Sequence, residues 1–207
     1  MRKVFQNELA KLEDELVTIA RLVEQAISDA TAAFKTSDIE LAETVADRGS
    51  EIEQACNALD ETAIDLLARQ APVASDLRLV VTALRISSSF ARMSDYALHI
   101  ANLARHRYPE RAIPKGLKKY FVEMGRLDTE IVGRLIVMLR EHDPRLLEEI
   151  DDVDDQIDEL HVRVFEKVLS GRFADDEASI VDATLASRFH ERFGDHAVSI
   201  AKRVADL

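Results

Sequence analysis

Tryptophan is absent from this 207-residue chain, and cysteine occurs once, at Cys56. A single cysteine excludes an intramolecular disulfide framework and cannot build a thiolate zinc site by itself. Glycine occurs six times and proline four times, which leaves few of the turn residues that a protein of many short strands requires. These scarcities favour long helices and a reducing compartment.

Long uncharged apolar runs are also missing. No apolar stretch approaches the roughly 20 residues that a membrane-spanning helix needs. The N-terminal sequence MRKVFQNELAKLEDELV introduces acidic residues early and lacks the apolar core of a secretory signal. We therefore expect a cytoplasmic protein that does not insert into a membrane.

Basic residues are outnumbered by acidic ones, 27 to 39, and the formal net charge is −12. Affinity for nucleic acids comes largely from Lys and Arg that displace counterions from phosphates. The charge balance therefore argues against nucleic-acid binding and favours cations or basic protein surfaces as partners.

Apolar residues recur at alternating three- and four-residue steps along residues 4–34, which indicates one face of an amphipathic helix. Ser37 and Asp38 offer N-cap oxygens for a second helix that extends to Arg69, and Pro72 marks the start of a third. The later breaks are YPERAIPKG, Asp143-Pro144 and Ser170-Gly171. The remaining expected helices cover residues 73–107, 117–141, 145–169 and 175–204.

An internal repeat links the two halves of the chain. The segment ARMSDYALHIA (91–101) lies one hundred residues before ERFGDHAVSIA (191–201), and both contain Arg-x-x-Asp. The sequence therefore predicts an all-α fold of six helices arranged as two tandem three-helix bundles, with residues 1–108 and 116–207 as the bundles and 109–115 as the linker.

Acidic residues recur in pairs four positions apart, which places each pair on one helix face. We match Asp47 and Glu51 in the first half with Asp154 and Asp158 in the second. Each pair alone is most simply a solvated surface, but aligned across neighbouring helices such pairs require a cation. A third pair, Glu191 and Asp195, closes the second half. Carboxylates with few imidazoles suit Mg²⁺, Ca²⁺, Mn²⁺ or iron better than zinc.

The histidines give no sign of catalysis. None is paired with a nucleophile in the sequence, and neither a glycine-rich phosphate loop nor a nucleophile elbow is present. His161 and His190 are each more simply surface or core residues, although either could complete a metal shell. We expect a protein that is not an enzyme.

The string LLARQAPVASDLRLVVTALRIS, followed by RMSDYALHIA and ERFGDHAVSIA, strongly resembles the PhoU family along the whole chain. The resemblance implies a homodimeric, noncatalytic negative regulator of phosphate uptake and phosphate-starvation signalling. It also implies an adaptor between the ATP-binding subunit of a phosphate transporter and a membrane sensor histidine kinase. Some members of the family bind iron or other metal clusters through E/D-x-x-x-D motifs.

By position, the resemblance assigns possible metal ligands in both halves. This chain departs from the family pattern at Ala91, where an acidic residue is expected, and at Ser94, where glycine is expected. The first half therefore loses a carboxylate, and we predict unequal metal affinity in the two halves. The candidate ligands are Asp47, Glu51, Asp95, Asp154, Asp158, Glu191 and Asp195.

Two other functions are compatible with the sequence. Helical bundles that carry interior Glu and His ligands can hold two irons, which makes an iron redox or storage protein the main alternative. Such proteins carry two Glu-x-x-His pairs, whereas this chain offers only Asp158-x-x-His161. A scaffold module that binds no metal is the third possibility.

Overall fold

A computed structural model describes residues 2–70, 74–170 and 177–207. Within these ranges the chain forms six helices and no strand, which confirms the all-α prediction. Pro72 and the expected starts at residues 73 and 175 lie outside the described ranges. The helices are α1 (Arg2–Thr36), α2 (Ile39–Gln70), α3 (Ala74–Arg107), α4 (Lys118–Glu141), α5 (Leu146–Leu169) and α6 (Glu177–Ala205).

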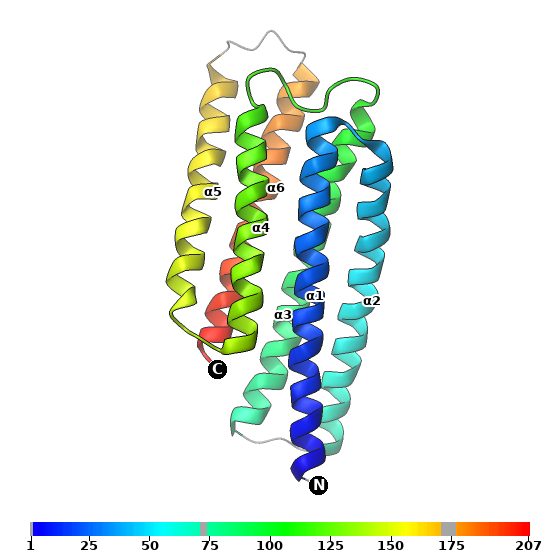
Figure 1. The fold of residues 1–207 in the computed structure, drawn as a ribbon, viewed down its shortest axis with the longest axis vertical. Helices are drawn as coiled ribbons and strands as arrows, with labels where there is room; N and C mark the ends of the chain where they lie inside the picture. Colours follow the sequence, from blue (N-terminus) through cyan, green and yellow to red (C-terminus); the bar gives the residue numbers. More distant parts are fainter. Residues whose placement is uncertain (1, 71–73, 171–176) are drawn as a thin grey trace.

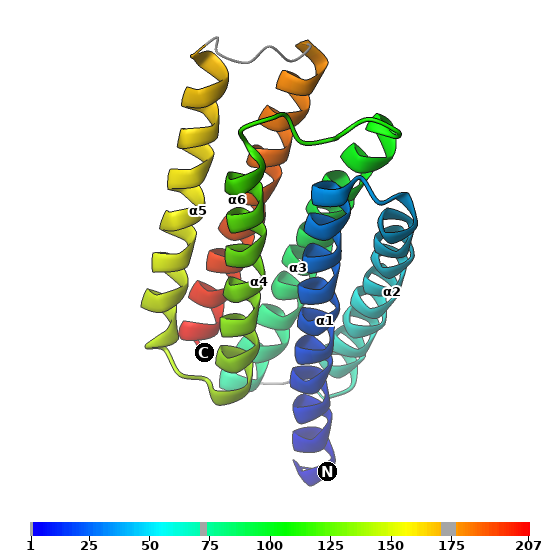
Figure 2. The ribbon, with the colours of Figure 1, turned by 45° about the horizontal axis from the view of Figure 1, so that its top comes forward.

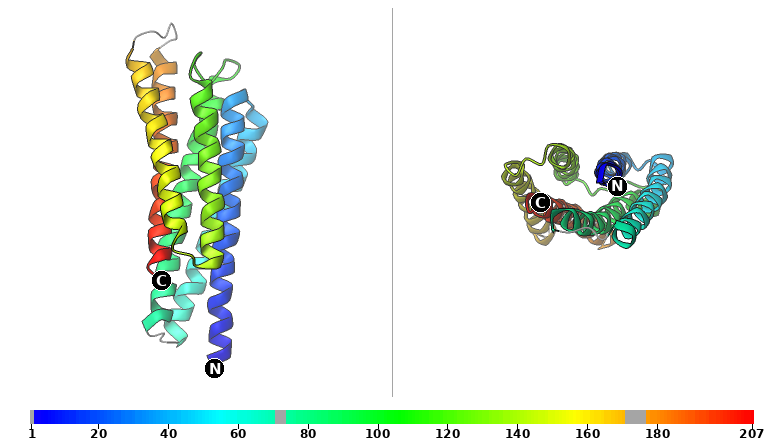
Figure 3. Two further views of the ribbon diagram at one scale, coloured as in Figure 1. Left: turned by 60° about the vertical axis from the view of Figure 1, so that its left-hand side comes forward. Right: turned by 90° about the horizontal axis from the view of Figure 1, so that it is seen from below.

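The helices form two three-helix bundles that lie side by side (Figure 1). Helices α1, α2 and α3 pack together, as do α4, α5 and α6. The bundles meet where α1 contacts α4 and where α3 contacts α6, and the end-on view places α2 and α5 at the two outer edges (Figure 3). No helix in the described part of the chain is long and apolar enough to cross a membrane.

Helices α1 and α4 end in the same way. Ser37 directly follows α1 and has a positive φ of 56°, and His142 is the C-cap of α4 and has a positive φ of 50°. A single left-handed residue ends a helix by turning the chain away from its axis. Asp38 then accepts a hydrogen bond from the Leu41 N–H at 3.0 Å, which confirms the expected cap of α2.

The connection between the bundles packs against the end of the molecule rather than extending from it (Figure 2). Ala112, Ile113 and Leu117 are buried. The Ala112 N–H donates a hydrogen bond to Ser37 Oγ at 3.1 Å. Residues 108–117 are therefore held by the turn between α1 and α2.

Close approach of α1 and α4 depends on Gly125. A Cβ at this position would overlap with the side chain of Thr31 on α1, so any larger residue would force the two helices apart. Nearby, the rings of Phe34 and Phe121 meet edge to face, with their centroids 5.2 Å apart. This contact joins the two bundles near the end at which α1 stops.

The second bundle contains a polar pair in its core. Asp128 on α4 and His190 on α6 are fully buried, and Nδ1 of His190 is hydrogen-bonded to Oδ2 of Asp128. Burial raises the pKa of the Asp128 carboxyl, and the charge of His190 opposes this rise. The second bundle repeats the first with an offset of 105 residues from α1 to α4 and of 100 residues from α3 to α6. The residues equivalent to Asp128 and His190 are therefore Val23 and Phe90, and both are buried.

We expect His190→Phe to destabilise the protein by about 3–5 kcal/mol, because it leaves the Asp128 carboxyl buried without its partner. The double variant Asp128→Val/His190→Phe copies the apolar pair of the first bundle and should be as stable as the parent or more stable. Urea unfolding followed by circular dichroism measures both. Equal stability of the single and double variants would contradict this account.

Candidate functional site

The buried residues of α2 and α5 determine which acidic side chains of these helices face a neighbouring helix. Val45, Ile52 and Leu59 are buried in α2, and Ile150, Ile157 and Val164 are buried in α5. Both rows have seven-residue steps and are offset by 105 residues. Asp154 is therefore equivalent to Gly49, and Asp158 to Glu53. The expected match of Asp47 with Asp154 and of Glu51 with Asp158 is wrong by two residues.

Helices α3 and α6 keep the offset of 100 residues that the repeat predicts. Met93, Ala97, Ile100 and Ala101 of α3 are buried, and so are Phe193, Ala197, Ile200 and Ala201 of α6. Asp95 and Asp195 therefore occupy equivalent positions, as do Ala91 and Glu191.

Four carboxylates gather between α5 and α6. Asp154 lies directly against the α6 backbone, where Gly194 leaves room for it, since a Cβ at Gly194 would overlap with Asp154 Oδ1. Asp158 and Asp195 are near enough to act electrostatically on Asp154, and both also act on Glu191. Of the seven predicted ligands, the structure brings together these four from the second half.

The environment of Asp154, Asp158 and Glu191 disfavours their charged forms. Burial, together with the charges of Asp158 and Asp195, raises the pKa of Asp154 to about 7. Burial also raises the pKa of Glu191, against the opposing charge of Arg188, and only 13% of the Glu191 side chain is exposed. Desolvated like charges raise one another's pKa in this way unless a cation compensates them.

Two carboxylate oxygens of this cluster have no hydrogen-bond donor among the described residues. They are Asp154 Oδ1 and Glu191 Oε2, and both are buried. Arginine neutralises part of the cluster, since Arg188 pairs with Glu191 and Arg192 pairs with Asp195 at 3.0 Å. Buried oxygens without a partner indicate that the cluster can accept a proton or a cation.

The side chains do not form a ready metal shell. In the described ranges, no group of three or more His, Cys, Asp or Glu side chains could hold a metal ion as the side chains lie. A cation shared between α5 and α6 therefore requires rotation of these carboxylates, and metal binding stays a prediction.

The first half offers a weaker set of carboxylates. Asp47 and Glu51 are both exposed on α2, and Asp95 pairs with Arg92 on its own helix at 3.0 Å. At the positions equivalent to Asp154 and Glu191 stand Gly49 and Ala91. The first half thus lacks counterparts of Asp154 and Glu191, the two most buried carboxylates of the α5–α6 cluster. The sequence comparison identified only the second of these losses, at Ala91.

The two histidines considered as extra ligands have other partners. The His190 ring is paired with Asp128 inside the bundle. The Nδ1 atom of His161 on α5 lies 3.0 Å from Ser187 Oγ on α6. Burial, together with the charge of Arg188, lowers the pKa of His161, against the opposing charge of Asp158.

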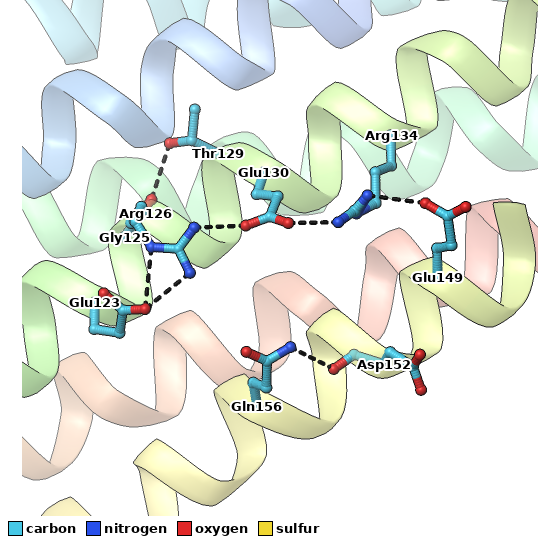
Figure 4. Close-up of polar contacts among 9 residues, drawn as sticks. All are labelled: Glu123, Gly125, Arg126, Thr129, Glu130, Arg134, Glu149, Asp152 and Gln156. Atoms are coloured by element: carbon cyan, nitrogen blue, oxygen red, sulfur yellow. Dashed lines mark hydrogen bonds and ion pairs between the residues drawn. The ribbon is translucent and has the colours of Figure 1, made fainter.

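The acidic residues of α5 face two different neighbours. Glu149 pairs at 3.0 Å with Arg134 of α4, which belongs to a chain of ion pairs along that helix with Glu130, Arg126 and Glu123 (Figure 4).

The same view shows Asp152 and Gln156, which are the α5 residues equivalent to Asp47 and Glu51 of α2. Both are exposed, and the Gln156 side chain donates to the Asp152 backbone oxygen at 2.9 Å. Residues at these two positions are therefore not part of the α5–α6 cluster.

The raised pKa of Asp154 predicts a pH-dependent effect of Asp154→Asn. A carboxyl group whose pKa is higher in the folded state than in the unfolded state destabilises the fold as the pH rises from about 4 towards 7. The variant should therefore gain thermal stability relative to the parent between pH 5 and pH 8. Melting curves of both proteins, with Asp47→Asn as the control for loss of an exposed carboxylate, measure this gain. A difference that does not grow with pH would contradict the assignment.

Comparison with known proteins identifies the same two halves. The family model of the PhoU domain matches residues 16–104 and again residues 121–204. A phosphate-specific transport system accessory protein, PhoU homolog 2 of Mycobacterium tuberculosis, is 38% identical over 204 residues, which cover 99% of this chain and 96% of that protein. PhoU homolog 1 of Mycobacterium leprae is 37% identical, with 99% and 92% covered.

Solved structures agree with these relatives. The crystal structure of PhoU from Pseudomonas aeruginosa matches with a TM-score of 0.90 at 25% identity and covers 97% of this chain and 96% of that one. The phosphate transport system regulatory protein PhoU from Streptococcus pneumoniae matches with a TM-score of 0.87, also at 25% identity, with 97% and 94% covered. With the domain matched in both halves and close relatives aligned end to end, the chain belongs to the PhoU family.

Proposed function

We propose that this protein is a noncatalytic negative regulator of phosphate uptake and phosphate-starvation signalling. It acts as an adaptor between the ATP-binding subunit of a phosphate transporter and a sensor histidine kinase. The observation that carries this proposal is the end-to-end match with relatives named as phosphate-specific transport system accessory proteins. The neighbour named a phosphate transport system regulatory protein supports it.

The geometry supports an adaptor because long helices expose extended charged faces. The partner surface that we favour is the α5–α6 side of the second bundle, where Asp154, Asp158, Glu191 and Asp195 concentrate negative charge. An excess of negative charge on a surface attracts a basic partner and speeds its association. The first bundle presents an equivalent face with fewer carboxylates.

We further propose that a hard cation binds at the α5–α6 cluster. The four carboxylates provide oxygen donors only, which suits Mg²⁺, Ca²⁺, Mn²⁺ or iron. Asp154 and Glu191 contribute oxygens that otherwise lack a donor, and a bound cation would relieve the repulsion among the four groups. The charge of this face, and hence its affinity for a basic partner, would then depend on the cation.

The adaptor role predicts recovery of both partners with the tagged protein from cells, in amounts that change between phosphate-rich and phosphate-poor medium. Mass spectrometry of pull-downs identifies the transporter subunit and the kinase directly. Asp154→Asn/Asp158→Asn should reduce recovery of at least one partner. Asp47→Asn/Glu51→Gln is the matched control, because it removes two charges four residues apart from α2. Failure to recover either partner in both media would overturn the proposed function.

The cation site predicts that the same two variants differ in metal binding. Calorimetric titration of the metal-free proteins with Mn²⁺ should show a large loss of affinity for Asp154→Asn/Asp158→Asn, because two of the four carboxylates become neutral amides. The control variant should bind as the parent does. An equal loss in both variants would refute a site confined to the second half.

A further inference from the structure

A cavity of about 460 Å³ lies at the end of the molecule where α1 stops and α4 begins. Its walls come from the end of α1 and from the connection between the bundles, which crosses this end (Figure 2). The cavity is lined by the cationic side chains of Lys35, Arg111, Lys115 and Lys118. No acidic residue lines it, although the whole chain carries a net charge of −12.

None of these four cations forms a close ion pair with a carboxylate in the described part of the chain. Elsewhere arginines pair with carboxylates, as Arg126, Arg134 and Arg188 do. Among residues 2–70, 74–170 and 177–207, no ion pair within 4 Å involves the side chains that line the cavity. The acidic residues nearest in sequence are Asp38 and Glu110. Asp38 caps α2 through its bond to the Leu41 N–H, and Glu110 does not line the cavity.

The start of α4 adds to this positive field. Its N-cap residue, Leu117, provides no side-chain hydrogen bond, and the first turn contains no acidic residue. The N-terminal end of a helix carries a partial positive charge that an anion stabilises. An anion in the cavity would therefore meet both the cationic side chains and the helix end.

The backbone around the cavity is held in place. Ala112, Ile113, Pro114 and Leu117 are buried, and the Ala112 N–H bonds to Ser37 Oγ. The neighbouring Gly116 has a φ of 90°, a conformation that glycine adopts without strain. Arg111 and Lys115 therefore project from a packed segment, and Lys35 and Lys118 from helix ends. A backbone that is already ordered lowers the entropy lost when a ligand is bound.

We propose that this cavity binds a soluble anion with two or more linked phosphate groups. Four cations and a helix end suit several negative charges, and cavities of about 300–1,000 Å³ are typical of sites for small molecules. The lining contains no aromatic ring on which a nucleobase could stack, so a linear oligophosphate fits better than a nucleotide. This site is distinct from the acidic α5–α6 cluster and does not depend on the proposed function.

Calorimetric titration of the purified full-length protein with tripolyphosphate tests the proposal. We expect saturable binding of one molecule per chain, tighter than binding of orthophosphate or sulfate at the same ionic strength, and weaker as salt is added. Arg111→Gln/Lys115→Gln should lower the affinity at least about tenfold, because it removes two charge-assisted contacts. Arg163→Gln/Lys167→Gln, which removes two cations from exposed positions of α5, should bind as the parent does.

Several results would overturn the proposal. They are an absence of binding, equal affinity for sulfate and tripolyphosphate, and equal loss of affinity in the two double variants. Sedimentation with vesicles containing phosphatidylglycerol distinguishes a lipid headgroup from a soluble ligand. Binding to the vesicles without binding to tripolyphosphate would assign the cations to a membrane surface instead. Unchanged melting curves of both variants would exclude misfolding as the cause of any loss.

Discussion

Burial of one apolar row on each outer helix sets the rotation of that helix, and the positions of the functional side chains follow from it. The row formed by Val45, Ile52 and Leu59 in α2 has its equivalent in Ile150, Ile157 and Val164 in α5. Rotating either helix enough to bring another acidic pair inward would expose such a row. Burying these side chains contributes about 1.5–3 kcal/mol each, so the apolar row outweighs the modest repulsion between surface carboxylates.

The two bundles share this apolar frame but differ in the polar groups that it holds. The second bundle has Asp154 and Glu191 where the first has Gly49 and Ala91, and it has Asp128 and His190 where the first has Val23 and Phe90. In each case the first bundle has an apolar residue or a glycine where the second has an ionisable one. The packing is thus the same in both halves, while at these four positions only the second half carries ionisable groups. The cationic side chains that line the cavity at the C-terminal end of α1 add to this uneven distribution of charge.

The helices and the repeat could be predicted from the sequence because hydrophobic periodicity and capping residues are local signals. The register of α2 against α5 was missed because the acidic run around Asp154 offers several carboxylate matches. The seven-residue spacing of the apolar residues Val45 and Ile52 matches that of Ile150 and Ile157 and gives the correct register. The Asp128–His190 pair joins residues 62 positions apart on α4 and α6, and only the packing of these helices reveals it. The only sign of this pair in the sequence is that Asp128 and His190 are polar where the first half has the apolar residues Val23 and Phe90.

Asp154 is held against α6 in a desolvated, negatively charged environment. The most direct test is an NMR titration of the carboxyl carbons in the metal-free protein. We expect Asp154 to titrate with a pKa of about 7, and we expect Asp158→Asn to lower this pKa by removing a neighbouring charge. An Asp154 pKa near 4, the ordinary value for aspartate, and unaffected by Asp158→Asn would contradict the account.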